Sequence, residues 1–583
     1  MLRMRKIFFV LILFSLLSLV ASCGGSSDSD GSDGSSDNDQ PDNPIAVGHT
    51  LISEDQTFIV PSDAPAGEYV GQIRLFPQFE GVGAAPVFTL TQNNDGIYAI
   101  DSEGLLTIAD NSNLAVGVDT ITVSITKTDF PEQSISVEIE VIDTAGAWFI
   151  DGDAAVNGSG TRTSPLNTIP AVTADNTALL FKRGSTITSG TNYINNISAF
   201  MAASYGTGEK PLLKTEGTFL RIYNNSHNPI VRDLSFTTSE PSLSNPGSLY
   251  SNWGAAIYAS AHTGTLQVLH CEMHHLTSGI TDVSMDFEDA ENSTHKWNII
   301  HDISQEGIFC KLISGTTTIS NNRIERINLL WFEDQTEQVS SGDGIQTYQT
   351  HRTIVQHNYI DRSYTGNKFC IIVDTYSTGT SGEGQAAEAV DISSNYLVGT
   401  LNGDDSILIY GYFLNGNISH NFGSRSQYFV MTGVSENINY HYNIIIRGQI
   451  RDSNAAVYNN VFYGPVTCLT GGHGAEEFYN NIVYFTEPGQ MAYFQGTVTS
   501  ADYNLYNQEQ TGMFGSGTDT VSSTGQESHS LVGDPLFTDI TNYDFTLAAS
   551  SPAIDKGIFL NLSSDHYLNP VGSSPDIGVH EVQ

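Results

Sequence analysis

A short apolar run following an asparagine recurs through residues 146–583. Successive asparagines are separated by 17 to 37 residues, and most of the gaps lie near 22. This period predicts the turns of a parallel β-helix, because a helical solenoid would show long stretches of 3.6-residue periodicity and none occurs. Asparagine suits a left-handed bend between strands and can stack as an amide ladder. The repeated residues are Asn298, Asn322, Asn358, Asn395, Asn421, Asn443, Asn460, Asn481 and Asn504.

Residues 46–143 have a different pattern, in which short strands of alternating polarity are separated by Gly, Pro, Asn and Asp turns. This pattern predicts a β-sandwich of about 100 residues. The hairpin at 100–107 and the strand at 137–143 resemble those of cadherin-like repeats. The resemblance implies calcium binding, but the acidic linker motif of that family is not evident. For this domain, a role as a spacer or in binding is therefore favoured over a role in adhesion.

The first 45 residues are predicted to lie outside the folded domains. Residues 1–23 combine a basic start, an apolar stretch and Val20-Ala21-Ser22-Cys23, which resembles the bacterial lipobox. Cys23 is accordingly the predicted lipidation site, which implies a lipid anchor in the outer membrane. Residues 24–45 are rich in Gly, Ser, Asp and Asn and are predicted to be a disordered tether. An acidic tract after the cysteine resembles the surface-export signal of Bacteroidetes lipoproteins, so exposure at the cell surface is expected.

Charge and cysteine content exclude several classes of function. The chain of 583 residues has 64 acidic and 23 basic side chains, a net charge of −41. Nucleic-acid binding is therefore not expected, since phosphate contacts require a basic face. Cys271, Cys310, Cys370 and Cys468 are scattered without a C-x-x-C pair and predict buried thiols, not disulfides or a zinc site. No organic cofactor is signalled, and a monomer is expected.

The ends of the 146–583 segment carry a second resemblance. The motifs at 148–151, 158–161 and 164–169 look like the first coil of carbohydrate-active β-helix proteins, and those at 534–537, 551–555 and 576–578 look like their last coils. The predicted fold is thus all-β, an N-terminal cadherin-like β-sandwich followed by a right-handed parallel β-helix. The resemblance implies an extracellular polysaccharide as the partner.

A second set of strands can be aligned on Gly254, Gly279, Gly307 and Gly344, with Lys368 and Ser406 at the same position in the next two coils. Because coils stack about 4.8 Å apart and side chains alternate between inside and outside, residues at one offset form a column. The alignment predicts one outward patch, flanked by insertions near 329–341 and 375–388 of a length that usually serves function. The patch residues are Glu306, Lys311, Asp343, Gln346, Tyr348, Lys368 and Asp374.

Basic residues are concentrated near this patch. Ten of the 23 lie between Lys296 and Arg451, and this favours an anionic ligand such as a uronate or sulfated glycan. Arg326 and Arg362 each lie four places after a repeated asparagine and are predicted to bind substrate, together with Gln346 and Asp374. Salt-bridge ladders are an equally good interpretation of such arginine columns, and a turn residue is an equally good interpretation of Asp343.

Three functions fit the sequence. A polysaccharide lyase needs a base, an acid and a group that neutralises the uronate carboxylate. Lys368 or Lys311 is the candidate base and Tyr348 the candidate acid, whereas Arg362, or calcium held by Asp343 and Glu306, is the candidate neutralising group. The fold resembles that of the alginate, chondroitin and pectate lyases, although only Asn367-Lys368 matches part of an alginate or chondroitin lyase motif.

The other two functions remain open at this stage. A glycoside hydrolase needs two carboxyl groups, for which Glu306 with Asp343, or Asp343 with Asp405, are candidates. A surface protein that binds glycan without cleaving it fits the lipid anchor and the sandwich equally well, since fold alone does not determine function.

Overall fold

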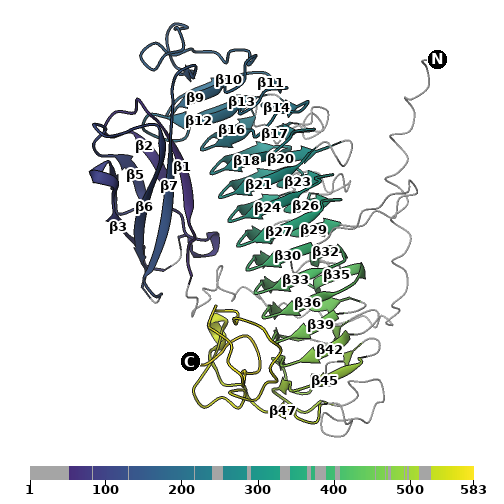
Figure 1. Cartoon of the computed structure of the whole chain (residues 1–583). Coiled ribbons are helices and arrows are strands. Elements are labelled where there is room, and N and C mark those ends of the chain that lie inside the picture. The colour runs from purple at the N-terminus through teal and green to yellow at the C-terminus, as the bar shows by residue number, and fades with distance from the viewer. Residues whose placement is uncertain are drawn as a thin grey trace, which may run out of the picture. The chain divides into compact units, whose positions relative to one another are not determined.

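The structure is a computed structural model, and the part that it describes is all-β. It consists of a β-sandwich followed by a right-handed parallel β-helix (Figure 1). No helix in that part of the chain is long and apolar enough to span a membrane. The described residues are 51–583 without 82, 129, 216, 239–253, 285–289, 328–341, 364–368, 375–388, 401–406, 453–454, 466–467, 471–474, 491–492, 495–497 and 511–526.

The sandwich consists of two sheets that pack around one apolar core. One sheet has the order β1-β7-β6-β3 and the other β2-β5-β4, and β1 lies parallel to β7. Alternation of polarity buries one face of β7, where Ile135, Val137, Ile139 and Val141 are at most 3% exposed. The elements are β1 (Gln56–Pro61), β2 (Tyr69–Gln72), η1 (Pro77–Phe79), β3 (Val87–Gln92), η2 (Asn94–Gly96), β4 (Tyr98–Ile100), β5 (Leu105–Ile108), β6 (Gly117–Thr126) and β7 (Gln133–Ile142).

Three long parallel sheets form the β-helix, and each coil from β9 to β44 contributes one strand to each of them. Sheet 1 contains β11 (Asn192–Asn195), β14 (Leu220–Tyr223), β17 (Ala255–Ala259), β20 (Ser278–Val283), β23 (Ile308–Lys311), β26 (Ile345–Tyr348), β29 (Ile371–Asp374), β32 (Ile407–Phe413), β35 (Tyr428–Ser435), β38 (Gln449–Arg451), β41 (Cys468–Thr470) and β44 (Tyr493–Phe494). Sheet 2 contains β8 (Trp148–Ile150), β9 (Ala178–Lys182), β12 (Met201–Tyr205), β15 (Ile230–Arg232), β18 (Thr265–Leu269), β21 (Asn292–Lys296), β24 (Thr316–Ser320), β27 (Arg352–Gln356), β30 (Ala389–Ser393), β33 (Gly416–Ser419), β36 (Ile438–His441), β39 (Ala455–Tyr458), β42 (Ala475–Tyr479) and β45 (Ser500–Asp502). Sheet 3 contains β10 (Thr186–Thr188), β13 (Leu212–Thr215), β16 (Ser235–Thr238), β19 (Glu272–Leu276), β22 (Ile299–Ile303), β25 (Arg323–Ile327), β28 (Tyr359–Asp361), β31 (Tyr396–Val398), β34 (Phe422–Ser424), β37 (Ile444–Ile446), β40 (Val461–Tyr463), β43 (Ile482–Tyr484), β46 (Leu505–Tyr506) and β47 (Leu531–Val532).

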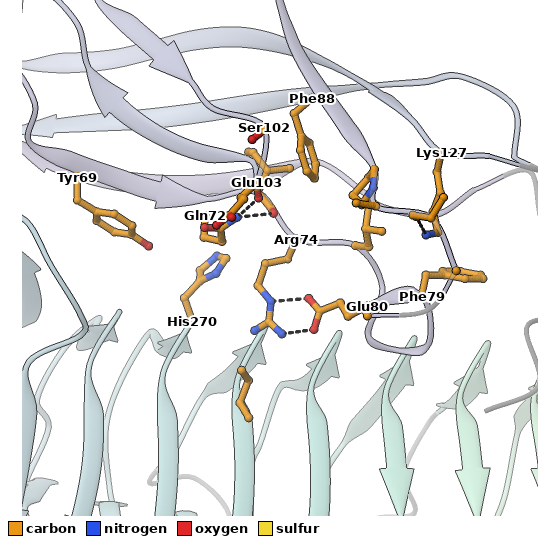
Figure 2. Close-up of a pocket in the computed structure, with 18 of the residues that line it drawn as sticks. Tyr69, Gln72, Arg74, Phe79, Glu80, Phe88, Ser102, Glu103, Lys127 and His270 are labelled. Atoms are coloured by element: carbon orange, nitrogen blue, oxygen red, sulfur yellow. Dashed lines mark hydrogen bonds and ion pairs between the residues drawn. The ribbon is translucent and has the colours of Figure 1, made fainter. Parts of the chain in front are cut away.

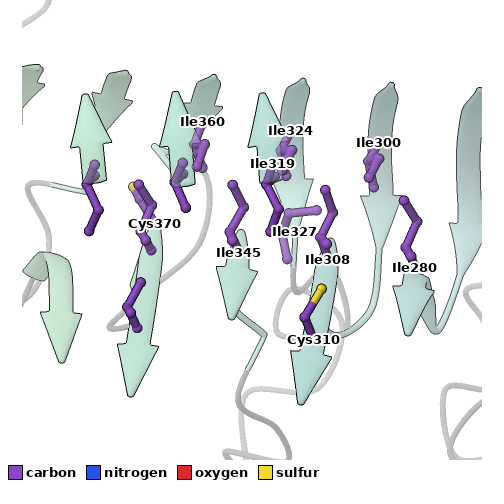
Figure 3. Close-up of a cluster of buried hydrophobic side chains, with 14 of the residues drawn as sticks. Ile280, Ile300, Ile308, Cys310, Ile319, Ile324, Ile327, Ile345, Ile360 and Cys370 are labelled. Carbon is purple, nitrogen blue, oxygen red and sulfur yellow. The ribbon is translucent and has the colours of Figure 1, made fainter. Parts of the chain in front are cut away.

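Columns of aliphatic side chains fill the inside of the β-helix (Figure 3). In sheet 1, Ile280 pairs with Ile308 and Ile308 with Ile345, so the same side chain repeats from coil to coil. Branched side chains suit such stacked strands, because each fits against its neighbour on the pleated surface. Cys271, Cys310 and Cys370 are buried free thiols, as the sequence predicts.

A ladder of asparagines runs along the turn between sheets 2 and 3. Each amide nitrogen from Asn298 to Asn481 donates to the amide oxygen of the next asparagine at 3.0–3.2 Å. The ladder is confirmed, but the left-handed bend lies one residue earlier than predicted. Trp297 (φ 60°) and Tyr442 (φ 55°) adopt it, because the asparagine itself must point its amide inward.

The sandwich docks on this same turn. Phe76 stacks on His357 at 4.1 Å between ring centroids, and Trp297 is buried in the sandwich core cluster. Arg74 donates to the carbonyl oxygen of Trp297 at 3.0 Å. Aromatic packing together with a charge-assisted hydrogen bond thus holds the two parts together.

The C-terminal segment covers the outer face of sheet 3. Phe422 lies 4.5 Å from Tyr396 between ring centroids and contacts Tyr543, and Phe545 packs against Tyr463. The segment contains β48 (Phe537–Asp539), η4 (Ile540–Asn542) and β49 (Asp544–Leu547). Sheet 1 lies on the side of the β-helix away from both coverings (Figure 1).

Candidate functional site

The outer face of sheet 1 carries two columns of side chains, set by the strand register. The first column follows the Cα pairs from β11 to β38, and the second runs beside it from β20 to β32. We call these columns together the sheet 1 face. The first column contains Tyr193, Arg221, Tyr258, Thr281, Phe309, Gln346, Ile372, Tyr410, Met431 and Arg451; the second contains Val283, Lys311, Tyr348 and Tyr412, and the backbone of Asp374 shares its register.

The predicted patch falls in the middle of this face. Lys311 pairs with Tyr348, as the alignment of coils predicts, and Gln346 lies beside them in the first column. The next coil is shifted by two residues from the prediction: Ile345 pairs with Ile371 and Tyr348 with Asp374, so Lys368 is not opposite Gly344. Lys311 and Tyr348 are half-buried, and Phe309 packs edge-on against Tyr348 at 6.3 Å between ring centroids. A lysine amine and a phenol therefore lie on neighbouring coils of the same face.

Asp343 is an exception to the predicted outward patch. It is 1% exposed, and its Oδ1 accepts from the backbone N–H of Phe369 at 3.1 Å. Arg362, also 1% exposed, lies 3.5 Å from the same oxygen and donates to the carbonyl oxygen of Phe369 at 2.6 Å. The predicted outward position of Asp343 is wrong, because side chains at a bend do not follow the alternation of a strand. Arg362, which the sequence predicts to bind substrate, is buried beside it.

The buried pair holds an aromatic ring beside the sheet 1 face. Asp343 binds the backbone N–H of Phe369, and Arg362 binds its carbonyl oxygen. The ring of Phe369 stacks on that of Tyr410, with 5.0 Å between the ring centroids. Burial lowers the pKa of Arg362, and the neighbouring carboxylate of Asp343 counters this effect. The Asp343–Arg362 pair therefore positions the ring of Phe369, which extends the aromatic surface of the first column.

Calcium does not fit the predicted ligands. Asp343 faces the cation Arg362, and Glu306 is half-buried and accepts from the hydroxyl of Ser278 at 3.4 Å. Within the described ranges, no group of three or more His, Cys, Asp or Glu residues has a geometry that could hold a metal ion.

The remaining predicted residues lie elsewhere. Arg326 belongs to β25 of sheet 3, where its Nε and Nη2 bind the two carboxylate oxygens of Asp302 at 2.6 and 2.8 Å. This contact lowers the pKa of Asp302 strongly, so the salt-bridge interpretation holds for Arg326. Lys368, Asp405 and both insertions lie outside the described residues. For Asp374 only the backbone register is described.

The sequence analysis missed the length of the face. Tyr410 contacts Tyr412 at 6.3 Å, Arg221 lies over the ring of Tyr258 at 5.3 Å, and Arg451 lies over Tyr428 at 5.9 Å. The repeat in the sequence could have revealed this longer column, since these residues occupy the same position in the coil as Phe309 and Gln346 or the position next to it. Ten strands at about 4.8 Å spacing give the first column a length of roughly 43 Å.

Comparison with known proteins gives neither a family nor a curated relative: no family model and no curated protein matches the chain. Among solved structures, the complex of XylC with xylose is 10% identical and covers 75% of this chain and 98% of its own, with a TM-score of 0.43. GH136 lacto-N-biosidase from Eubacterium ramulus is 12% identical, with a TM-score of 0.37. The alignment with it spans 60% of this chain and 65% of that enzyme.

Pectate lyase Pel9A is a third similar structure. It is 13% identical and covers 75% of this chain and 96% of its own, with a TM-score of 0.29. At these values the likeness concerns the fold and carries no argument about activity.

Proposed function

We propose that the sheet 1 face binds an extended anionic polysaccharide and cleaves it by β-elimination. The observation that carries the proposal is the pairing of Lys311 with Tyr348 on neighbouring coils, beside a column of aromatic and polar side chains. A flat array of rings suits sugar rings, and the basic groups suit a carboxylate or sulfate.

The reaction would use the paired groups as base and acid. Lys311, in its neutral form, takes the proton from C5 of a uronate, the C4–O bond breaks, and a C4=C5 double bond forms. Tyr348 donates its proton to the leaving oxygen, which becomes a hydroxyl group. Gln346 lies close enough in the register to hydrogen-bond the uronate carboxylate, and Lys368 remains the alternative base.

Absorbance in the near ultraviolet tests this proposal, because the unsaturated product absorbs there and a hydrolysis product does not. We expect Lys311→Ala and Tyr348→Phe each to reduce the rate at least ~100-fold, the usual contribution of a general acid or base. Lys214→Ala, which removes a half-buried lysine of sheet 3, is the matched control and should leave the rate unchanged. Wild-type rates in both face variants would refute the assignment.

Binding without cleavage is the second candidate, and the length of the first column favours it. A column from Tyr193 to Arg451 extends well beyond one catalytic pair. Affinity for a glycan that is lost in Phe309→Ala, without any new reducing end, would select this function. Reducing ends without absorbance would select hydrolysis, for which the pair of Glu306 with the buried Asp343 is poorly placed.

The cellular context is part of the same proposal. A lipid on Cys23, a tether over 24–45, a cadherin-like domain at 46–143 and the β-helix at 146–583 would present a monomeric protein at the outer surface of the outer membrane. Labelling with a fatty-acid analogue that is lost in Cys23→Ala would test the anchor.

A further inference from the structure

A cavity of about 710 Å³ lies between the sandwich and the β-helix (Figure 2). Its volume is within the ~300–1,000 Å³ typical of sites for small molecules. The sandwich contributes the end of β2, the turn between β4 and β5, and the segment before β3. The β-helix contributes Lys210, His270 and Ile299. This cavity is on a different side of the β-helix from the sheet 1 face.

Hydrogen bonds between the two parts fix the walls of the cavity relative to each other. Arg74 binds both carboxylate oxygens of Glu80, at 2.6 and 2.7 Å, and reaches the carbonyl oxygen of Trp297 across the interface. On the other side of the cavity, Tyr69 donates to Asp233 at 3.3 Å. Residues from both parts thus hold the walls apart at a set distance.

Local charge in the cavity is opposite in sign to that of the whole chain. Lys210 pairs with Asp233 at 3.1 Å, but Asp233 also binds Arg183, so one carboxylate serves two cations. Burial lowers the pKa of His270 well below its usual value, and the cations Arg232, Lys210 and Arg74 lower it further. In a chain of net charge −41, this surplus of positive charge favours an anionic group.

Apolar surface and hydrogen-bonding groups are combined in the same cavity. Phe88, which is 8% exposed, contributes part of an aromatic ring, whereas Gln72, Ser102 and Glu103 provide polar atoms near the rim (Figure 2). His270 rises from the β-helix toward Gln72, with its ring stacked on Trp297 at 6.2 Å. A sugar offers C–H groups to an aromatic face and hydroxyl groups to polar atoms, and so matches both surfaces.

We propose that the interdomain cavity is a second binding site, which takes a short acidic oligosaccharide. A sugar ring lies against Phe88, and its carboxylate points to Lys210 and His270. The amide of Gln72 donates to or accepts from the sugar hydroxyl groups at the rim, and the carboxylate of Glu103 accepts from them. The site stands independently of any cleavage on the sheet 1 face, since it shares none of the residues of that face.

Calorimetric titration of the full chain with digalacturonate, and with its dimethyl ester as the uncharged counterpart, tests the proposal. We expect the acid to bind at least tenfold more tightly than the ester. Lys210→Met should weaken binding of the acid at least tenfold and leave the ester unaffected. Ala85→Trp, which places a bulky ring at the exposed rim of the cavity, should abolish binding of both.

A matched control separates this site from the rest of the surface. Lys214→Met removes a lysine outside the cavity and should bind as the wild type does. Thermal unfolding midpoints of all variants confirm that they are folded. No binding of either ligand, or wild-type binding in both Lys210→Met and Ala85→Trp, would overturn the proposal. Equal affinity for acid and ester would overturn recognition of the carboxylate.

Discussion

The asparagine ladder makes a prediction whose size can be worked out bond by bond. Asn421 is fully buried, and its amide nitrogen donates to the carbonyl oxygen of Ile392 at 2.8 Å and to Asn443 at 3.0 Å. Its amide oxygen accepts the backbone N–H and the side-chain N–H of Asn395 at 2.9 and 3.0 Å. Asn421→Ala therefore removes four hydrogen bonds at one position.

Only some of the groups left behind lose every partner. The side chain of Asn395 keeps bonds to the carbonyl oxygens of Val355 and Ser393, and Asn443 keeps the backbone N–H of residue 421. The backbone N–H of Asn395 loses the acceptor described above, and the carbonyl oxygen of Ile392 loses one donor. At ~1–3 kcal/mol for each buried unsatisfied group, the expected cost is about 2–4 kcal/mol.

An exposed pair of the same residue type provides the matched control. Asn439 donates to Asn417 at 3.2 Å across neighbouring coils, and both side chains are exposed. Asn439→Ala should change the free energy of unfolding by less than ~0.5 kcal/mol, as surface substitutions usually do. Urea unfolding followed by circular dichroism measures both variants, and hydrogen exchange shows whether loss of protection begins near Asn395. Equal effects of the two substitutions would refute the reasoning.

Three further predictions concern other buried contacts. His262 lies 3.1 Å from Asp282 inside the β-helix; burial opposes its charge, but the carboxylate prevails and raises its pKa. The stabilisation from this pair is complete below about pH 6.5 and is lost as the pH rises through the raised pKa of His262. The urea midpoint of the wild type should therefore fall over that pH range, and the midpoint of His262→Gln should not. Burial raises the pKa of Glu581 to about 8, so protection of the C-terminal segment against hydrogen exchange should decline between about pH 4.5 and 8, and Glu581→Gln should flatten this decline. Phe76→Ala removes a ring that is 1% exposed and should cost about 3–5 kcal/mol, with faster limited proteolysis of the sandwich as the measurement.

The repeat could be predicted from the sequence because its determinants are local. A ladder needs one amide in every coil, so the asparagines mark the period directly, and the alternation of strands places Lys311 beside Tyr348. Residues at the bends between strands follow neither the asparagine period nor the strand alternation, so the direction of their side chains could not be predicted. Asp343 has the same sequence context as an outward residue, and only the path of the chain to Phe369 turns its carboxylate inside.

Docking of the sandwich was beyond prediction for a related reason. Nothing in the sequence marks His357 or Trp297 as contacts of Phe76, because their stacking joins two segments more than 200 residues apart. Such contacts come from the complementarity of two finished surfaces, which no periodicity along the chain records. The interdomain cavity follows from the same contacts and could not be predicted either.

The acidity of the chain and the proposed anionic ligands can be reconciled by distance. At physiological salt the screening length is about 8 Å, so carboxylates on other faces contribute little at the sheet 1 face or in the interdomain cavity. The local potential at these two places is set by nearby cations, which are Lys311 and Arg451 on the sheet 1 face and Lys210 in the cavity. A net charge of −41 then keeps the protein soluble and repels polyanions from most of its surface, and so directs them to the few places where basic groups are concentrated.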